Sequence, residues 1–161
     1  GVCCFKCFRY KMGEIMTSCN FYQADKKDVK DIIKILKIFK EDLSECNYPE
    51  IRTEKLQKFI FAMLEKGKII CVKNLDDNKL IGVCIFYKTA YWWSDDQTIV
   101  IQLIYVLKKY RNYQVVKQLI DSVKQVSENL PISLSIIAKL NGDKLFEKLG
   151  FENMGANWRL K

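Results

Sequence analysis

Two apolar runs separated by an amphipathic pattern constrain the fold of this chain more than any other feature. The first run, from Thr98 to Leu107, is nearly continuous, as is typical of a strand buried on both faces. The second, from Ile132 to Ala138, follows Pro131. Between them, residues 114–129 have apolar side chains at helical spacing, namely Val116, Leu119, Ile120, Val123 and Val126. Strand, helix and strand in this order predict two parallel strands joined by a right-handed crossover.

Further elements extend this unit into a mixed sheet. From apolar spacing and turn residues, the expected strands are 14–22, 69–73, 80–88 and 151–160, and the expected helices are 29–43, 53–66 and 141–148. The strands 69–73 and 80–88 flank a turn and predict an antiparallel hairpin. The order predicts one α/β (α+β) domain over residues 14–161, with a mixed central sheet and helices on both of its faces.

The composition removes several classes of catalytic site. The 161 residues include no histidine, which excludes Ser-His-Asp triads, Cys-His pairs and His-ligated zinc. Acid–base chemistry must therefore use Asp, Glu, Tyr, Cys, Lys, main-chain groups or water. Apolar stretches are short and interrupted, so we expect no transmembrane segment. Seven is an odd number of cysteines, and Cys19, Cys71 and Cys84 lie inside predicted strands, so we expect reduced thiols and an intracellular, cytoplasmic protein.

The N-terminal residues 1–13 are rich in cysteine and aromatic side chains, and we expect them to form a packed or partly flexible apolar arm. Cys4 and Cys7 form one Cys-x-x-Cys pair, but the second pair of a zinc site is missing, so we predict no metal. The first four residues are similar to an N-terminal lipidation signal. Phe5 stands where that signal needs Ser or Thr, so we do not expect lipidation.

A net charge of +8 suggests an anionic partner, and its distribution decides which kind. Lysines are spread from Lys6 to Lys161, and no nucleic-acid-binding motif is present, so we expect no nucleic-acid partner. One segment differs, because residues 97–120 contain no acid, while Lys108, Lys109 and Arg111 precede a predicted helix. A helix N-terminus beside cations favours an anion such as phosphate; the alternative is a solvated basic loop.

Three motifs, in the right order, resemble the GNAT N-acetyltransferase superfamily. Val106 followed by Arg111 is similar to the family's acyl-CoA motif V-x4-R-x-x-G-x-G/A, with Gln114 and Val116 at the two glycine positions. The sequence NGDKLFEKLGF, at 141–151, resembles the family's C-terminal signature. The sequence DDNKLIG, before and within the second hairpin strand, resembles a D-x-x-L-I-G stretch.

The resemblance covers roughly residues 14–160 and implies a GNAT-like fold whose two central parallel strands splay apart. It implies acetyl-CoA as co-substrate, with its pyrophosphate on the loop before the helix and Arg111 as a phosphate partner. The pantetheine arm would lie between the splayed strands. The cofactor-binding residues that it implies are Ile104, Tyr105, Val106, Lys109, Arg111, Asn112, Tyr113, Gln114, Val115, Val116 and Asn141.

Two departures from the family pattern affect this expectation. Glycine lets a backbone approach phosphate closely, whereas Gln114 and Val116 allow this only if their side chains point away. The family often has a tyrosine as general acid where this chain has Phe146, which has no proton to give. Asn141 also lies closer to Gly150 than its counterpart in most relatives.

Catalysis in the family is direct acyl transfer from the thioester to a neutral amine. Tyr105 is the expected substitute acid, with Tyr110 and Tyr113 as alternatives. Asp96 is the expected base, with Asp95 or a water chain as alternatives.

The resulting hypothesis is an N-acyltransferase that moves an acetyl group from acetyl-CoA to an amine. The acceptor is a small molecule or a protein, and the chain is a monomer or a homodimer. Tyr91, Trp92 and Trp93 either line the acceptor site or pack at a strand end. The alternative is a catalytically degenerate GNAT-fold protein that binds CoA or a protein partner without turnover.

Overall fold

The computed structural model describes residues 4–12, 15–66, 68–135, 143–155 and 158–160, with side chains described from residue 18 onward. Within these ranges six strands form one sheet, in which the spatial order is the chain order. The strands are β1 (Cys4–Met12), β2 (Ile15–Gln23), β3 (Lys68–Asn74), β4 (Lys79–Ala90), β5 (Gln97–Val106) and β6 (Ile132–Leu134). Neighbours from β1 to β5 are antiparallel and β6 is parallel to β5, so the sheet is mixed.

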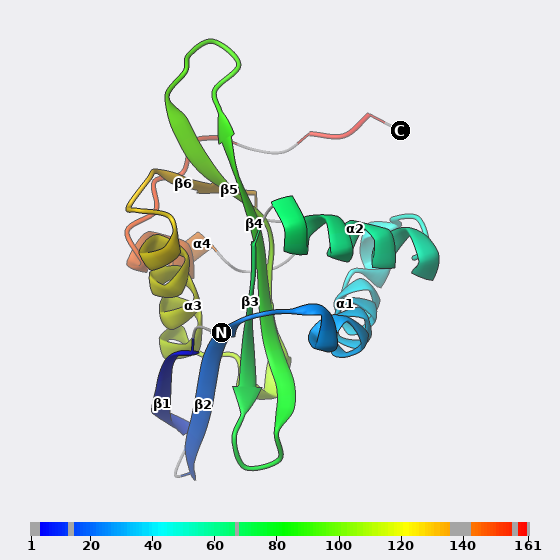
Figure 1. Cartoon of the computed structure of the whole chain (residues 1–161), viewed down its shortest axis with the longest axis vertical. Helices are drawn as coiled ribbons and strands as arrows, with labels where there is room; N and C mark the ends of the chain where they lie inside the picture. The colour runs from blue at the N-terminus through cyan, green and yellow to red at the C-terminus, as the bar shows by residue number, and fades with distance from the viewer. Residues whose placement is uncertain (1–3, 13–14, 67, 136–142, 156–157, 161) are drawn as a thin grey trace.

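Helices cover both faces of this sheet (Figure 1). The helices α1 (Val29–Asp42) and α2 (Thr53–Lys66) lie on one face, and α3 (Tyr113–Val126) and the short α4 (Asp143–Lys148) lie on the other. Short 3-10 turns are η1 (Lys26–Asp28), η2 (Ser44–Cys46) and η3 (Lys108–Tyr110). The predicted α/β (α+β) fold, with a mixed sheet and helices on both faces, is confirmed.

Each face of the sheet has its own apolar core, and a single strand can contribute side chains to both cores. In β3, Ile69 and Cys71 pack toward α1 and α2, while Ile70 and Val72 pack toward α3, and all four are fully buried. Successive side chains of a strand point to opposite faces, so a strand covered on both sides needs a continuous apolar run. This explains the uninterrupted apolar segments in the sequence.

The N-terminal segment, for which we predicted no strand, contributes β1. Residues 4–12 pair with β2 along most of its length, from Cys4 opposite Tyr22 to Met12 opposite Ile15. Aromatic residues such as Phe5 and Phe8 favour extended backbone, and the free edge of β2 supplies hydrogen-bonding partners. The boundary that we placed at residue 13 as a domain limit stays a prediction.

The C-terminal prediction of one or two strands over 151–160 is wrong for the residues that the structure describes there. Residues 151–155 and 158–160 contain no strand. The side chain of Asn153 accepts a hydrogen bond from the main chain of Gly155, a local turn that competes with strand pairing. Phe151 packs at the border of the α3 core, but Met154, Trp158 and Leu160 are exposed, so the described residues after Phe151 bury no large apolar side chain against the sheet.

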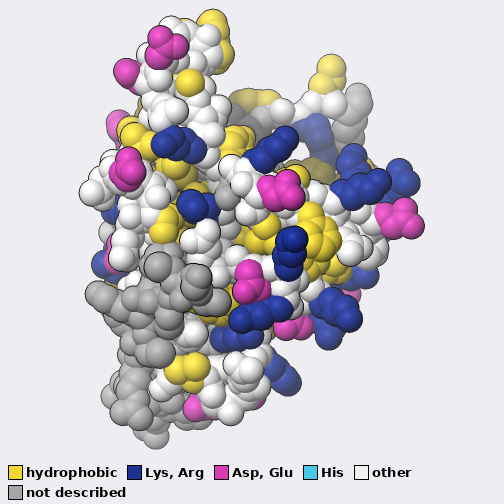
Figure 2. Space-filling model, viewed as in Figure 1, with side chains coloured by type: hydrophobic (Ala, Val, Ile, Leu, Met, Phe, Trp, Pro, Cys, Tyr) yellow, Lys and Arg dark blue, Asp and Glu magenta, His cyan; other side chains and the backbone are white. Residues whose placement is uncertain are grey.

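The surface over α1 and α2 carries charges of both signs. In the space-filling view, Lys and Arg side chains gather over the half of the molecule where these helices lie, with acidic side chains among them (Figure 2). Lys30, Lys34 and Lys37 of α1 are exposed, as are Asp31 and Glu41 of the same helix. This mixed pattern is typical of a solvated helix surface.

Candidate active site

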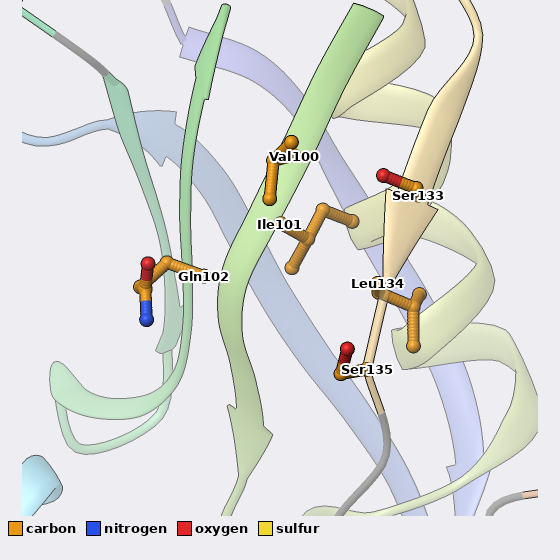
Figure 3. A pocket seen from close by; sticks show the side chains of 6 residues that line it. All are labelled: Val100, Ile101, Gln102, Ser133, Leu134 and Ser135. Carbon is orange, nitrogen blue, oxygen red and sulfur yellow. The ribbon is translucent and has the colours of Figure 1, made fainter. Parts of the chain in front are cut away.

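The parallel strands β5 and β6 separate after a short paired stretch. Ile99, Val100 and Ile101 lie opposite β6, and β5 then continues to Val106 with no β6 residue paired to it in the described part of the chain. A pocket of about 270 Å³ opens at this fork, lined by Val100, Ile101, Gln102, Ser133, Leu134 and Ser135. Figure 3 shows these side chains on the two diverging strands. The pairing and the pocket fit the predicted splay of the central strands, and the continuation of β6 after Ser135 lies outside the described residues.

A β-bulge lies in β5 at the same place. Ile85 of β4 is opposite Leu103, but its neighbour Phe86 is opposite Ile101, so Gln102 has no partner on β4. The bulge shifts the side-chain alternation: Ile101 packs toward α3, whereas after the bulge it is Ile104 that packs there and Leu103 that faces α1 and α2. Main-chain groups of β5 at the pocket are thereby taken out of the regular ladder.

The end of β5 is tied to the loop that follows it by Arg111. The guanidinium donates two hydrogen bonds to the main-chain oxygen of Val106, 2.8 Å from Nη2 and 3.1 Å from Nε. The same group lies 5.4 Å from the ring centre of Tyr105, a cation–π distance. Arg111, predicted as a phosphate partner, therefore also has a structural part in holding the loop against the strand.

Tyr105 faces α1, where its hydroxyl donates a hydrogen bond of 2.5 Å to Oδ2 of Asp42. Its ring lies edge-on to Phe39 at 5.3 Å, and the residue is buried. Burial, followed by the hydrogen bond to Asp42 and the charge of that carboxylate, holds the pKa of Tyr105 well above its usual range. The hydroxyl that we predicted as a general acid is thus committed to a carboxylate on the α1 side of the sheet.

The N-terminus of α3 follows this loop and is capped by Asn112. The side-chain oxygen of Asn112 accepts from the N–H of Val115 at 2.9 Å, and its main-chain oxygen accepts from the N–H of Val116 at 3.2 Å. Among the described residues, no acceptor bonds the N–H of Tyr113 or Gln114. These two groups point out of the helix start, where anions bind favourably.

The side chains at the two glycine positions of the acyl-CoA motif lie in different environments. Val116 is buried in the core below α3, and Gln114 is exposed to solvent. Val115 is also buried. In the first turn, only the N–H groups of Tyr113 and Gln114 therefore stay without an acceptor among the described residues, because Asn112 takes those of Val115 and Val116.

The remaining loop residues surround the helix start. Lys109 is exposed, with its ammonium 5.4 Å from the ring centre of Tyr110. Lys148 of α4 lies 4.2 Å from the ring centre of Tyr113. Tyr110 accepts a hydrogen bond from the side chain of Asn74 at the end of β3. Asn141, the last of the predicted cofactor-binding residues, lies outside the described residues.

Asp96, the predicted base, lies at the far end of β5 from Tyr105. It is exposed in the turn between β4 and β5, and nine residues of extended chain correspond to about 30 Å. Tyr91, Trp92 and Trp93 share that turn, and the ring centre of Trp93 lies 5.0 Å from that of Tyr91 and 5.1 Å from that of Trp92. The structure does not bring the two predicted catalytic residues together.

Phe146, at the position where a tyrosine acid is often found, is packed against another aromatic ring. It meets Phe151 edge-on, with ring centres 5.5 Å apart, at the border of the α3 core. This contact gives Phe146 a clear packing role beside the helix start.

Sequence reasoning missed three residues of this region. Asp42 is 63 positions from Tyr105, and no local pattern connects them. Gln102 is the bulge residue, and Ser133 lines the fork. The one available signal is that Gln102 is a polar residue inside the apolar run 98–107.

Two further features concern the described part of the chain alone. No group of three or more Cys, Asp or Glu residues is placed to hold a metal ion there. None of the helices in those ranges has the length and apolarity to cross a membrane.

Comparison with known proteins gives a consistent result. Residues 34–159 match the family described as acetyltransferase (GNAT) domain. A search of curated protein sequences finds no match. Among solved structures, a possible acetyltransferase from Clostridium difficile 630 is similar at 18% identity and a TM-score of 0.68, covering 89% of this chain and 96% of the other.

Two other structures are similar at comparable levels. The aminoglycoside 6′-N-acetyltransferase AAC(6′)-Ih from Acinetobacter baumannii has 12% identity and a TM-score of 0.68, with 89% of this chain and 97% of the other covered. An acetyltransferase from Trypanosoma brucei has 17% identity and a TM-score of 0.67, with 89% and 99% covered. At these identities the likeness establishes the fold.

Proposed function

Since the chain belongs to the GNAT acetyltransferase family, we propose that it transfers an acetyl group from acetyl-CoA directly to an amine. In this reaction the neutral amine attacks the thioester carbonyl and forms the C–N bond. The C–S bond then breaks, the amine loses a proton, and the thiolate of CoA gains one. No covalent enzyme intermediate is required, so catalysis rests on positioning and on polarising the carbonyl.

The fork between β5 and β6, with the bulge at Gln102, is the observation that carries this proposal. The described pairing of β5 with β6 ends at Ile101, and in this proposal an extended arm pairs with the β5 main chain beyond that point. The stretch from Gln102 to Tyr105 offers about 10 Å of such edge, because the Val106 oxygen already accepts from Arg111. At the bulge, main-chain groups outside the β4 ladder can polarise a thioester carbonyl.

The loop after β5 and the start of α3 are suited to bind phosphate. The N–H groups of Tyr113 and Gln114 stand at a helix N-terminus, where the helix dipole favours negative charge. Lys109 and Arg111 lie in the loop immediately before it. An arm bound along β5 would lead from the fork to these groups, which makes one continuous site for the thioester and the pyrophosphate.

The proton transfers are assigned to Tyr105 and Asp96. Tyr105 can protonate a thiolate only after it exchanges its bond to Asp42. Asp96 would require an acceptor that reaches the β4–β5 turn. Tyr105 as acid and Asp96 as base therefore stay predictions, and water is the alternative for both.

Titration with acetyl-CoA by calorimetry tests the binding step. Ser133→Trp places a large side chain on an exposed position of the fork, and we expect it to weaken binding at least tenfold. Gln97→Trp adds the same side chain at the exposed start of β5, outside the pocket, and should leave the affinity within twofold. Absence of wild-type binding at millimolar acetyl-CoA would refute the proposal.

A second function is favoured by two contacts of the aromatic side chains. Phe146 packs on Phe151 and has no proton to donate, and the Tyr105 hydroxyl is held by Asp42. These contacts fit a degenerate GNAT-fold protein that binds CoA or a protein partner without turnover. Binding of acetyl-CoA without thiol release across a panel of amines would favour this alternative.

The acceptor, the cellular location and the assembly are also part of this proposal. Aminoglycosides are a rational part of the amine panel, because AAC(6′)-Ih is one of the structures that share this fold. Cys19, Cys46, Cys71 and Cys84 are free thiols, which fits a reducing cytoplasm. A monomer or a homodimer stays the predicted assembly.

A further inference from the structure

Asp42, the last residue of α1, is the meeting point of three groups from the β5 end and its loop. Its Oδ2 accepts the 2.5 Å hydrogen bond from Tyr105 and lies 3.9 Å from Nη2 of Arg111. Its Oδ1 lies 3.9 Å from Nζ of Lys108. The carboxylate is mostly buried, with 17% of the side chain exposed.

The position of Asp42 in its own helix is unfavourable. The C-terminus of a helix has a partial negative charge, so a carboxylate in the last turn is repelled by it. Leu43 caps the helix through its main chain, and Asp42 has no part in that cap. The contacts with Tyr105, Arg111 and Lys108 are therefore what stabilises this side chain.

Asp42 also reduces the net positive charge around the loop between β5 and α3. The segment 97–120 contains no acid, so its cations look free of any partner in the sequence. In space, Asp42 supplies one negative charge from α1 to Lys108 and Arg111 together. An anionic ligand that contacts Lys108 or Arg111 would therefore meet this negative charge as well as the cations.

The two cations are held with different strength. Arg111 keeps two hydrogen bonds to the Val106 oxygen that do not involve Asp42. The side chain of Lys108 is 75% exposed, and its one ionic contact within the described residues, at 3.9 Å, is weak for an exposed pair. Lys108 is thus free to leave Asp42 for a phosphate, while Arg111 stays in place.

We propose that Asp42 limits the affinity of the β5–α3 loop for phosphate, because its carboxylate competes with the ligand for Lys108 and Arg111. For acetyl-CoA as the ligand, this inference rests on the proposed function. Asp42 is a positioning residue in this account, since it acts through Lys108 and Arg111 and touches no reacting atom.

Asp42→Asn tests this proposal, because it is expected to strengthen pyrophosphate binding, whereas structural damage would weaken it. The amide oxygen keeps an acceptor for the Tyr105 hydroxyl, and the negative charge is lost. We expect inorganic pyrophosphate to bind about three to ten times more tightly at low ionic strength, with the gain shrinking as salt is added. Unchanged or weaker binding by a folded variant would overturn the inference.

Asp31→Asn is the matched control. It changes the net charge equally, on an exposed residue of the same helix, eleven positions or about 16 Å away. Its pyrophosphate affinity should stay within twofold of the wild type. An equal gain from Asp31→Asn would mean that net charge alone is responsible, and would also overturn the inference.

Lys108→Ala completes a double-mutant cycle. In the Asp42→Asn background it should remove most of the gain, because the released lysine is its main source. If Asp42→Asn does not fold, Lys108→Ala in the wild-type background decides, with about three- to tenfold weaker pyrophosphate binding expected. An unchanged affinity would contradict the inference.

Using both ligands separates this inference from the proposed function. Tighter pyrophosphate binding by Asp42→Asn without any acetyl-CoA binding would support the role of Asp42 and refute the acetyltransferase. If the wild type binds acetyl-CoA but Asp42→Asn binds neither acetyl-CoA nor pyrophosphate more tightly, the proposed function is supported and the role of Asp42 is refuted. Binding of neither ligand to any variant would refute both.

Discussion

The hydroxyl of Tyr105, near the end of β5, is hydrogen-bonded at 2.5 Å to the carboxylate of Asp42, at the end of α1. This bond joins the sheet to a helix on one face, beside the loop that Arg111 ties to Val106. It therefore connects the stability of the α1 face with the geometry of the candidate phosphate site.

Removal of this hydroxyl should destabilise the fold. Tyr105→Phe leaves Asp42 mostly buried without its hydrogen-bond donor, and we expect the free energy of unfolding to fall by about 1.5–3 kcal/mol. Tyr87→Phe on β4 is the control, because the Tyr87 hydroxyl has no hydrogen bond among the described residues. Urea denaturation of both variants checks this, and equal losses would contradict the assignment.

The aromatic pair at α4 gives a prediction about turnover. If the missing acid limits the rate, Phe146→Tyr supplies a phenol at the position implied by the family and should raise kcat by about tenfold or more. Phe151→Tyr adds the same hydroxyl to the other ring of the pair and should not raise it. Steady-state kinetics with melting temperatures separate catalysis from packing; no gain from Phe146→Tyr would remove the idea that a lost acid limits the rate.

Gly82 permits the close approach of β4 and β5. A Cβ atom there would lie 3.3 Å from both the main-chain oxygen of Tyr105 and a methyl group of the Val106 side chain. Gly82→Val should therefore cost about 1–3 kcal/mol of stability. Lys88→Val introduces the same side chain at an exposed position of β4 and should cost far less stability. If chemical denaturation shows a larger loss for Lys88→Val than for Gly82→Val, the backbone at Gly82 is not crowded as described.

Buried thiols predict a loss of stability in alkali. Burial raises the pKa of the Cys19 thiol to about 11, and the charge of Asp76 adds to the shift. Because the folded-state pKa is above the unfolded value, the stabilisation is complete below about pH 9 and is lost as the pH rises toward 11. Urea denaturation across this range should show the decline, and Cys19→Ala should make it shallower, because the buried thiols of Cys71 and Cys84, whose pKa values are also raised, still contribute; an identical slope in the variant would exclude Cys19 as a source.

The elements that sequence alone predicts are those with local patterns. The helical spacing of Leu119, Ile120 and Val123 is visible in one short window, and the buried face of α3 follows it. The turn between β3 and β4 is equally local, since Asn78 adopts a positive φ of 57° there. Such features need no knowledge of distant residues.

The features that escaped prediction depend on distant contacts or on strand phase. The bulge at Gln102 sits in a strand that is apolar on both faces, so no alternation reveals the shift. The Asp42–Tyr105 bond joins two elements that meet only in the folded chain. The strand predicted after Phe151 failed because an apolar composition says nothing about whether a covering face exists.

Thiol release from acetyl-CoA in the presence of a panel of primary amines tests the central claim most directly. We expect wild-type protein to release CoA and to increase the mass of one amine by an acetyl group, and Ser133→Trp to lose this activity while Gln97→Trp retains it. Saturable acetyl-CoA binding without acetylation of any amine, or equal release by Ser133→Trp, would contradict the account of an acetyltransferase working at the β5–β6 fork.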